Sequence, residues 1–158
     1  MTKLLVRNEE VLIHAAAARE LATHTLLHLP HESCGVLLGT AAAGSIQIEK
    51  FHPIRNVAPD PLHAFTFHPE EWIKFCLHPE RLVGIVHSHP HSQPIPSQDD
   101  LTKLNGYGQL LDAYLICSPN ESSNSIIIHS YRIIHPSFHS KTEINDNFRL
   151  LRTQLTVT

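Results

Sequence analysis

Apolar positions along the chain follow two periodicities, one typical of helices and one typical of strands. An alanine- and leucine-rich stretch from Val11 to about Leu27 has helical spacing, and Asn8 is placed to cap its start. Pro30 predicts the end of this helix, because the residue before a proline is pushed out of helical geometry. The first part of the chain is therefore expected to be one long helix.

Short apolar runs bounded by turn residues predict strands after this helix. Residues 33–39 form such a run between glycines, and residues 45–54 alternate between apolar and polar side chains. Ala43-Gly44 supplies a turn between them, so we expect a hairpin. The β-branched run at residues 82–86 predicts a central strand, and residues 113–117 and 125–133 predict two more.

Further helices are expected between these strands. His68-Pro69 with two following glutamates has the start signals of a helix that ends at His78-Pro79, and Ser97 begins another that stops near Asn105-Gly106. Weak signals favour a last helix near residues 145–155. We therefore assign residues 1–135 to one domain and residues 136–158 to a C-terminal tail with a short helix packed on that domain.

Composition narrows the class of protein. The 158 residues carry 12 basic and 15 acidic side chains, with no basic stripe of the kind that nucleic-acid partners require. The three cysteines, Cys34, Cys76 and Cys117, are widely spaced, which predicts reduced thiols rather than disulfides. No apolar signal core is present near residue 1, so we expect a cytoplasmic protein with no membrane partner. The sequence carries no signal for an oligomeric state.

A candidate metal site follows the predicted central strand. His87 and His89 are two residues apart, and on a strand such residues point to the same side. Asp99 and Asp100 open the next helix and offer a carboxylate. Two imidazoles and one carboxylate can hold zinc while leaving its fourth position to water, as in catalytic zinc sites.

Each of these residues also has a purely structural interpretation. Ser97 and Asp100 have the spacing of a helix capping box, and Glu32 alone would be an exposed carboxylate after a helix. His91 continues the alternation of His87 and His89 and offers a third imidazole, although Pro90 bends the chain before it.

The full pattern resembles a known family. Glu32, then His87-Ser88-His89, seven residues, Ser97, two residues and Asp100 is similar to the motif of JAMM metallopeptidases, also called MPN+ or JAB domains. The flanks, Glu32-Ser-Cys-Gly-Val-Leu-Leu-Gly39 and Gly84-Ile-Val-His-Ser-His-Pro90, resemble the stand-alone bacterial branch. The resemblance covers roughly residues 11–133.

This resemblance implies a single-domain α/β fold with a curved, mostly antiparallel or mixed sheet flanked by helices, similar in outline to cytidine deaminases. It implies a zinc-dependent peptidase or isopeptidase, in which His87, His89 and Asp100 bind Zn²⁺. The matching glutamate of the family, here Glu32, is the general base, and the matching serine, here Ser97, stabilises the oxyanion.

Bacterial members of the family imply a substrate class, the C-terminal glycines of small ubiquitin-like sulfur-carrier proteins. The main alternative is a catalytically silent MPN-type binding module, although such modules usually lack the ligands that this chain has. A zinc deaminase would need a Cys-x-x-Cys pair, and the sequence has none.

Overall fold

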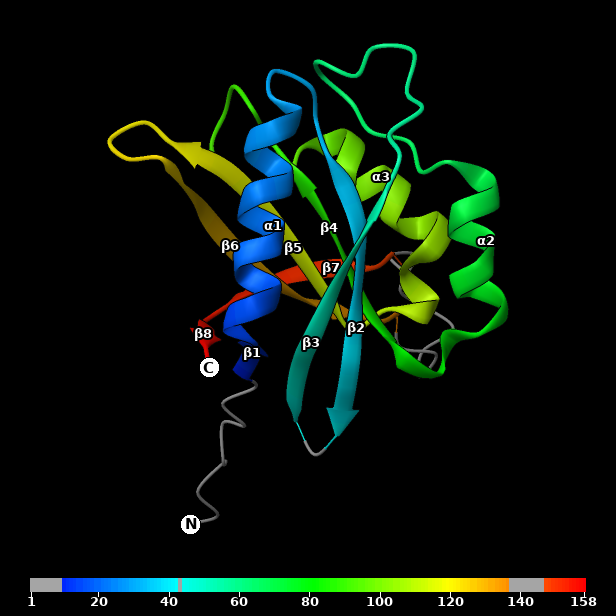
Figure 1. The fold of residues 1–158 in the computed structure, drawn as a ribbon. Coiled ribbons are helices and arrows are strands. Elements are labelled where there is room, and N and C mark those ends of the chain that lie inside the picture. Colours follow the sequence, from blue (N-terminus) through cyan, green and yellow to red (C-terminus); the bar gives the residue numbers. More distant parts are fainter. Residues whose placement is uncertain (1–9, 43, 137–146) are drawn as a thin grey trace.

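The computed structural model describes residues 10–42, 44–136 and 147–158. Within these residues the chain forms one eight-stranded sheet and three α-helices (Figure 1). The strands are β1 (Glu10–Ile13), β2 (Cys34–Ala42), β3 (Ser45–Ile54), β4 (Leu82–Ser88), β5 (Ala113–Asn120), β6 (Ser125–Ile134), β7 (Arg149–Thr153) and β8 (Leu155–Val157). The helices are α1 (Ala15–His28), α2 (Pro69–Leu77) and α3 (Gln98–Tyr107), with 3-10 turns η1 (Pro79–Arg81) and η2 (Gly108–Leu110).

The sheet is mixed, and its strand order is β7-β6-β5-β4-β2-β3-β1-β8. β2 pairs antiparallel with β3, which confirms the predicted hairpin, and Gly44 at its tip has the positive φ of 83° that favours glycine. β4 and β5 run parallel and are connected through α3, as parallel strands require. The predicted α/β fold with a mixed sheet flanked by helices is confirmed.

Helices cover both faces of the sheet, so both faces bury apolar side chains. In Figure 1, α1 crosses in front of the strands and packs Ala17 and Leu21 into one cluster with Ile48 of β3. On the other face, α3 contributes Leu104 to a second cluster, against which Trp72 of α2 also packs. β5 supplies alternate residues to the two clusters, as a strand buried on both sides should.

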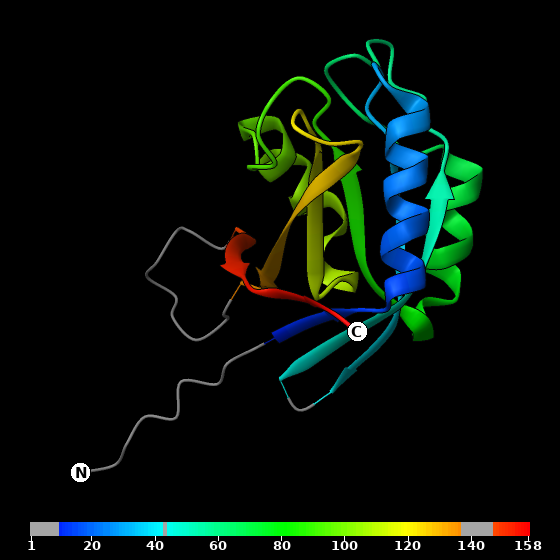
Figure 2. The ribbon, with the colours of Figure 1, turned by 60° about the vertical axis from the view of Figure 1, so that its left-hand side comes forward.

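The segment at residues 149–157 closes both margins of the sheet. β7 pairs antiparallel with β6 at one margin, and β8 pairs parallel with β1 at the other. Figure 2 shows this segment, in red, running from β6 to β1. The helix predicted near residues 145–155 is therefore wrong where the structure describes it, because edge pairing with β6 and β1 overrides the weak local signal.

The long first helix also needs correction. Residues 10–13 form β1 between β3 and β8, and α1 begins only at Ala15, after His14 in an extended conformation. The apolar run Val11-Leu12-Ile13 suits either element when it is judged by periodicity alone. The predicted end is confirmed, since α1 stops at His28 before Pro30. Asn8 lies outside the described residues.

The cysteines are free thiols, as predicted. Cys34 and Cys117 are buried, and burial raises the pKa of each to about 12, so both stay protonated at neutral pH. Cys76 on α2 is partly buried. Among the described helices, none has the length and apolar character needed to span a membrane.

Candidate metal centre

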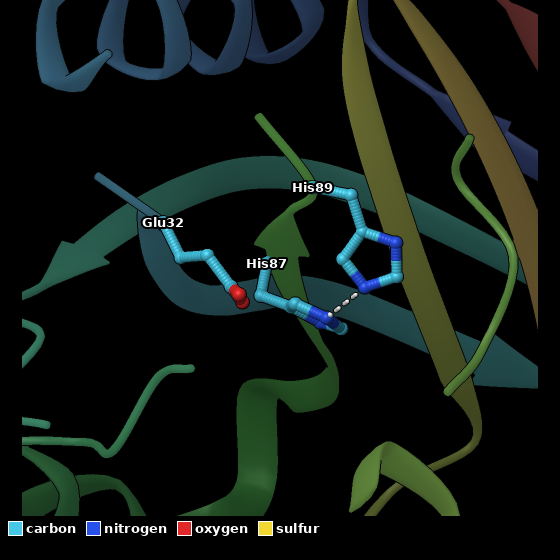
Figure 3. Close-up of side chains that lie close together, drawn as sticks. All are labelled: Glu32, His87 and His89. Carbon is cyan, nitrogen blue, oxygen red and sulfur yellow. Dashed lines mark hydrogen bonds between the residues drawn. The ribbon is translucent and has the colours of Figure 1, made fainter. Parts of the chain in front are cut away.

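The buried central strand β4 delivers two imidazoles to one point. β4 lies between β2 and β5 with all of its residues buried, and it leads directly into His89. The Nε2 atoms of His87 and His89 are 3.0 Å apart, and both side chains are nearly inaccessible to solvent. Figure 3 shows the two rings turned toward each other, as the spacing of two residues on a strand predicts.

The first turn of α3 brings a carboxylate to the same point. One oxygen of Asp100 lies 3.2 Å from Nε2 of His87, and the other lies 3.2 Å from Nε2 of His89. The backbone N–H of Ser97 donates to this carboxylate at 2.9 Å, while the Ser97 hydroxyl accepts from the N–H of Asp100 at 3.1 Å. The capping box is therefore present, and it also orients the carboxylate toward both imidazoles.

Glu32, just before β2, completes the cluster. Its carboxylate lies within 4.8 Å of ligand nitrogens of both histidines, and only 7% of the residue is exposed. Its backbone is fixed on both sides, since its N–H donates to the carbonyl of Pro61 at 2.7 Å and its carbonyl accepts from the Asn56 side chain at 3.0 Å. The hydroxyl of buried Ser88 accepts the N–H of Ser33 at 2.8 Å, which ties the end of β4 to this segment.

Neighbouring groups orient each imidazole. Nδ1–H of His89 donates to the carbonyl of Gln93 at 2.9 Å, which leaves its Nε2 lone pair free for a metal. Nδ1 of His87 lies 3.1 Å from the hydroxyl of buried Tyr114 on β5. The ring of Phe65 stacks on His87 with centroids 4.4 Å apart.

Lys103 of α3 secures this stacking residue. Its ammonium donates to the carbonyl of Phe65 at 2.7 Å and lies 5.1 Å from the centre of the Phe65 ring. Asp99 pairs with the same ammonium at 3.1 Å. Of the two acidic residues that open α3, Asp100 is therefore the one that faces the imidazoles.

The pKa values of Asp100, His87 and His89 depend on one another. Burial would raise the pKa of Asp100, but hydrogen bonds from His87 and His89 outweigh burial and hold that pKa well below its usual range. Burial lowers the pKa of His87, whereas the hydrogen bonds of His89 to Asp100 and the Gln93 carbonyl overcome burial and raise its pKa. The Asp100 carboxylate is therefore held in its ionised form at a buried point between the two imidazoles.

The pKa of Glu32 shifts in the direction opposite to that of Asp100. Burial raises the pKa of its carboxyl to about 7, against the opposing influence of His89, and the Asp100 carboxylate adds to the rise. A carboxyl group with a pKa near neutral pH can both accept and return a proton.

The donor set fits a tetrahedral cation. Ligand atoms about 2.0–2.1 Å from zinc at tetrahedral angles are roughly 3.3 Å from one another. The Nε2 atoms of His87 and His89 are 3.0 Å apart, and each lies 3.2 Å from a different oxygen of the Asp100 carboxylate. Neutral imidazole nitrogens and a carboxylate are ligands that zinc prefers, and the Glu32 carboxylate lies near both imidazoles (Figure 3).

The structure brings His87, His89, Asp100 and Glu32 together, and Ser97 lies beside Asp100 at the start of α3. Ser97 is exposed, and since its hydroxyl only accepts in the capping box, its own proton stays available to donate. His91 is exposed and its ring lies 6.4 Å from that of His63, so it stands apart from the converging nitrogens. Sequence reasoning missed Tyr114 and Phe65, because cross-strand neighbours and loop packing leave no local signal.

Comparison with known families identifies this arrangement. The model of prokaryotic homologs of the JAB domain matches residues 14–142, which is most of the chain and contains all five site residues. The chain belongs to the prokaryotic JAB family. The JAB segment thus includes every described element from α1 to β6.

Curated relatives share part of this JAB domain. A desampylase from Haloferax volcanii is 39% identical over 95 residues, which cover 58% of this chain and 65% of the relative. A probable TtuB-protein conjugate cleaving protease from Thermus thermophilus is 34% identical over 86 residues, or 52% of this chain and 55% of the relative. A tail tip assembly protein K from an Escherichia phage is 31% identical over 103 residues, which cover 65% of this chain and 39% of the relative. The chain spans 65% or less of the length of each relative.

A solved structure shares the fold over most of its length. The solution structure of a protein from Desulfitobacterium hafniense superposes with a TM-score of 0.66 and covers 94% of both chains. At 21% sequence identity, this likeness concerns the JAB fold alone.

Proposed function

We propose that this JAB protein is a zinc-dependent hydrolase that cuts a peptide or isopeptide bond. The observation that carries the proposal is the convergence of His87, His89, Asp100 and Glu32 on one buried point. We assign the zinc ligands to His87, His89 and Asp100, because each imidazole Nε2 lies 3.0–3.2 Å from the other imidazole and from an oxygen of Asp100. Glu32, within 4.8 Å of both imidazoles, is left to act on the water. Zinc held there supplies a Lewis acid and a water of lowered pKa.

Glu32 moves the proton in this reaction. Its carboxylate accepts a proton from the attacking water and then returns it to the nitrogen of the leaving amine, so no net proton is consumed at the residue. The pKa of about 7 suits both steps, since each form of the carboxyl is accessible at neutral pH. A bound cation would lower this raised pKa and so favour the ionised form that acts as base.

Ser97, and the groups that hydrogen-bond to the imidazoles, position the reacting atoms. In the proposal, the hydroxyl proton of Ser97 is donated to the oxygen that becomes negative when the carbonyl is attacked, a contribution typically worth a few kcal/mol. The capping box fixes this hydroxyl relative to Asp100. Gln93 and Tyr114 keep the imidazoles oriented, which avoids a reorganisation cost during the reaction.

For the substrate, we propose the C-terminal glycine of a small ubiquitin-like carrier protein joined to an amine. Support comes from two relatives whose names describe the removal of such conjugates, the desampylase and the TtuB-protein conjugate cleaving protease. The physiological carrier would be a partner of this chain only during the reaction.

The test is to incubate the purified protein with a carrier conjugated through its terminal glycine and to weigh the products. Hydrolysis should stop with a chelator and return with zinc, and Glu32→Gln should abolish it without removing the metal. Asp100→Asn should lose metal, whereas Asp99→Asn, its exposed neighbour, should keep both metal and activity. A zinc-loaded wild-type protein that cleaves no such conjugate would favour the silent binding module instead.

A further inference from the structure

A second pair of imidazoles lies on α1, outside the candidate metal centre. His24 and His28 are four residues apart, so they occupy adjacent turns of one helix face. Their ring centroids are 4.0 Å apart with an interplanar angle of 41°. Two histidines four residues apart on a helix can bind the same metal ion.

The hydrogen bonding of His28 prepares it as a ligand. Its Nδ1–H donates to the backbone carbonyl of His24 at 2.8 Å, so its Nε2 lone pair is left free. The same arrangement is present at His89, whose Nδ1–H donates to the carbonyl of Gln93 at 2.9 Å. A backbone carbonyl on the second ring nitrogen is the usual support of a metal-binding histidine.

His24 is held in the form that binds metal. Its ring packs near Phe51 of β3, with centroids 5.3 Å apart, and is partly buried. Burial, together with repulsion from His28, lowers the pKa of His24 to about 4. The imidazole is therefore neutral at pH 7, and a cation does not have to displace a proton from it.

The pair shares a cavity with the proposed general base. A cavity of about 560 Å³ is lined by His24, His28 and His31 on one side and includes Glu32 and Ser33 in its wall. The N–H of His31 donates to the carbonyl of His28 at 2.8 Å, which keeps this further imidazole at the same end of the helix. An ion bound at the pair would therefore lie in the same cavity that Glu32 helps to line.

We infer that His24 and His28 form a second, weaker site for a divalent transition metal, and that loading it inhibits the enzyme by obstructing part of the cavity that Glu32 also lines. The site is weaker than the first because it has two neutral ligands and no carboxylate. Its affinity should follow the general order for imidazole ligands, with Cu²⁺ above Zn²⁺. The inhibitory part of the inference rests on the proposed hydrolytic function.

Zinc titration of the metal-free full chain, in competition with a coloured chelator at pH 7, tests the site without using activity. The wild type should bind two zinc ions with different affinities. The double variant H24A/H28A should keep only the tight event, and H87A/H89A only the weak one. H28A alone changes an exposed side chain and should weaken the second event at least about tenfold.

The matched control is H14A/H78A, which removes two exposed histidines that flank different helices, His14 before α1 and His78 after α2. It should retain both events. One bound zinc in the wild type, two in H24A/H28A, or equal loss in the control would overturn the site.

Excess zinc should then slow conjugate cleavage by the wild type but not by H24A/H28A. Equal inhibition of both proteins would overturn the regulatory part. If neither protein cleaves the conjugate, the proposed function fails, whereas the zinc counts still decide whether His24 and His28 bind metal.

Discussion

The hydroxyl of Tyr114 allows a direct test of how β5 supports the candidate metal centre. It lies 3.1 Å from Nδ1 of His87, and both side chains are almost fully buried. Without metal, Nε2 of His87 can donate to Asp100 while the Tyr114 hydroxyl donates to Nδ1. When a metal binds at Nε2, the proton must move to Nδ1, and Tyr114 then becomes the acceptor.

Replacing Tyr114 with phenylalanine therefore affects the two states differently. In the metal-free protein the change removes one neutral hydrogen bond, which is worth about 1 kcal/mol of unfolding free energy. In the metal-bound protein it also leaves a buried N–H without an acceptor, at a cost of about 1–3 kcal/mol. Zinc affinity should thus fall roughly 10- to 100-fold, while the variant remains folded.

The assay is competition for zinc between each protein and a chelator of known affinity, with thermal unfolding of the metal-free proteins measured in parallel. Tyr131→Phe is a matched control, because the Tyr131 hydroxyl donates to the carbonyl of Pro94 rather than to a ligand. Unchanged zinc affinity in Tyr114→Phe, or an equal loss in Tyr131→Phe, would refute the assigned role.

Two further predictions concern stability. Because the folded pKa of Glu32, about 7, lies above its ordinary value of 4.5, metal-free wild type should lose stability as pH rises from 4.5 to 7. Glu32→Gln lacks this titrating group, so by pH 8 its free energy of unfolding in chemical denaturation should exceed that of wild type by roughly 1–2 kcal/mol. This is about half the full linkage value, because the group borders a cavity. A difference in unfolding free energy that does not change with pH contradicts this account. Gly39→Ala should cost about 2 kcal/mol or more, since a Cβ there meets the carbonyl of Gln47, whereas Gly106→Ala in α3 meets nothing and should stabilise by about 0.5–1 kcal/mol. Equal unfolding midpoints for the two glycine variants would rule out this account.

Much of the fold was predictable because local signals agreed with the final packing. The hairpin of β2 and β3, the central strand β4 and the start of α3 at Ser97 each carry strong turn, strand or capping residues. The candidate site was predictable for a related reason. A strand aims His87 and His89 to one side, and a helix start follows within reach of them.

The remaining features depend on contacts between distant residues. Whether Val11-Leu12-Ile13 continues a helix or forms a strand is decided by its neighbours β3 and β8, which the local sequence does not reveal. The position of Glu32 likewise depends on Pro61 and Asn56, which come from a loop after β3. Local sequence shows which side chains are suited to a role, whereas register decides which of them meet.

The pairing of β7 and β8 with opposite margins of the sheet has a consequence for the folding pathway. Glu10 and Thr156, which hydrogen-bond across that junction, are 146 residues apart, and contacts of such separation form slowly. The strands around the metal centre are joined by shorter segments, as with Ser33 and Ser88, 55 residues apart. We therefore expect zinc present during refolding to be captured by an intermediate whose outer strands are still unpaired, and to protect it from edge-to-edge aggregation.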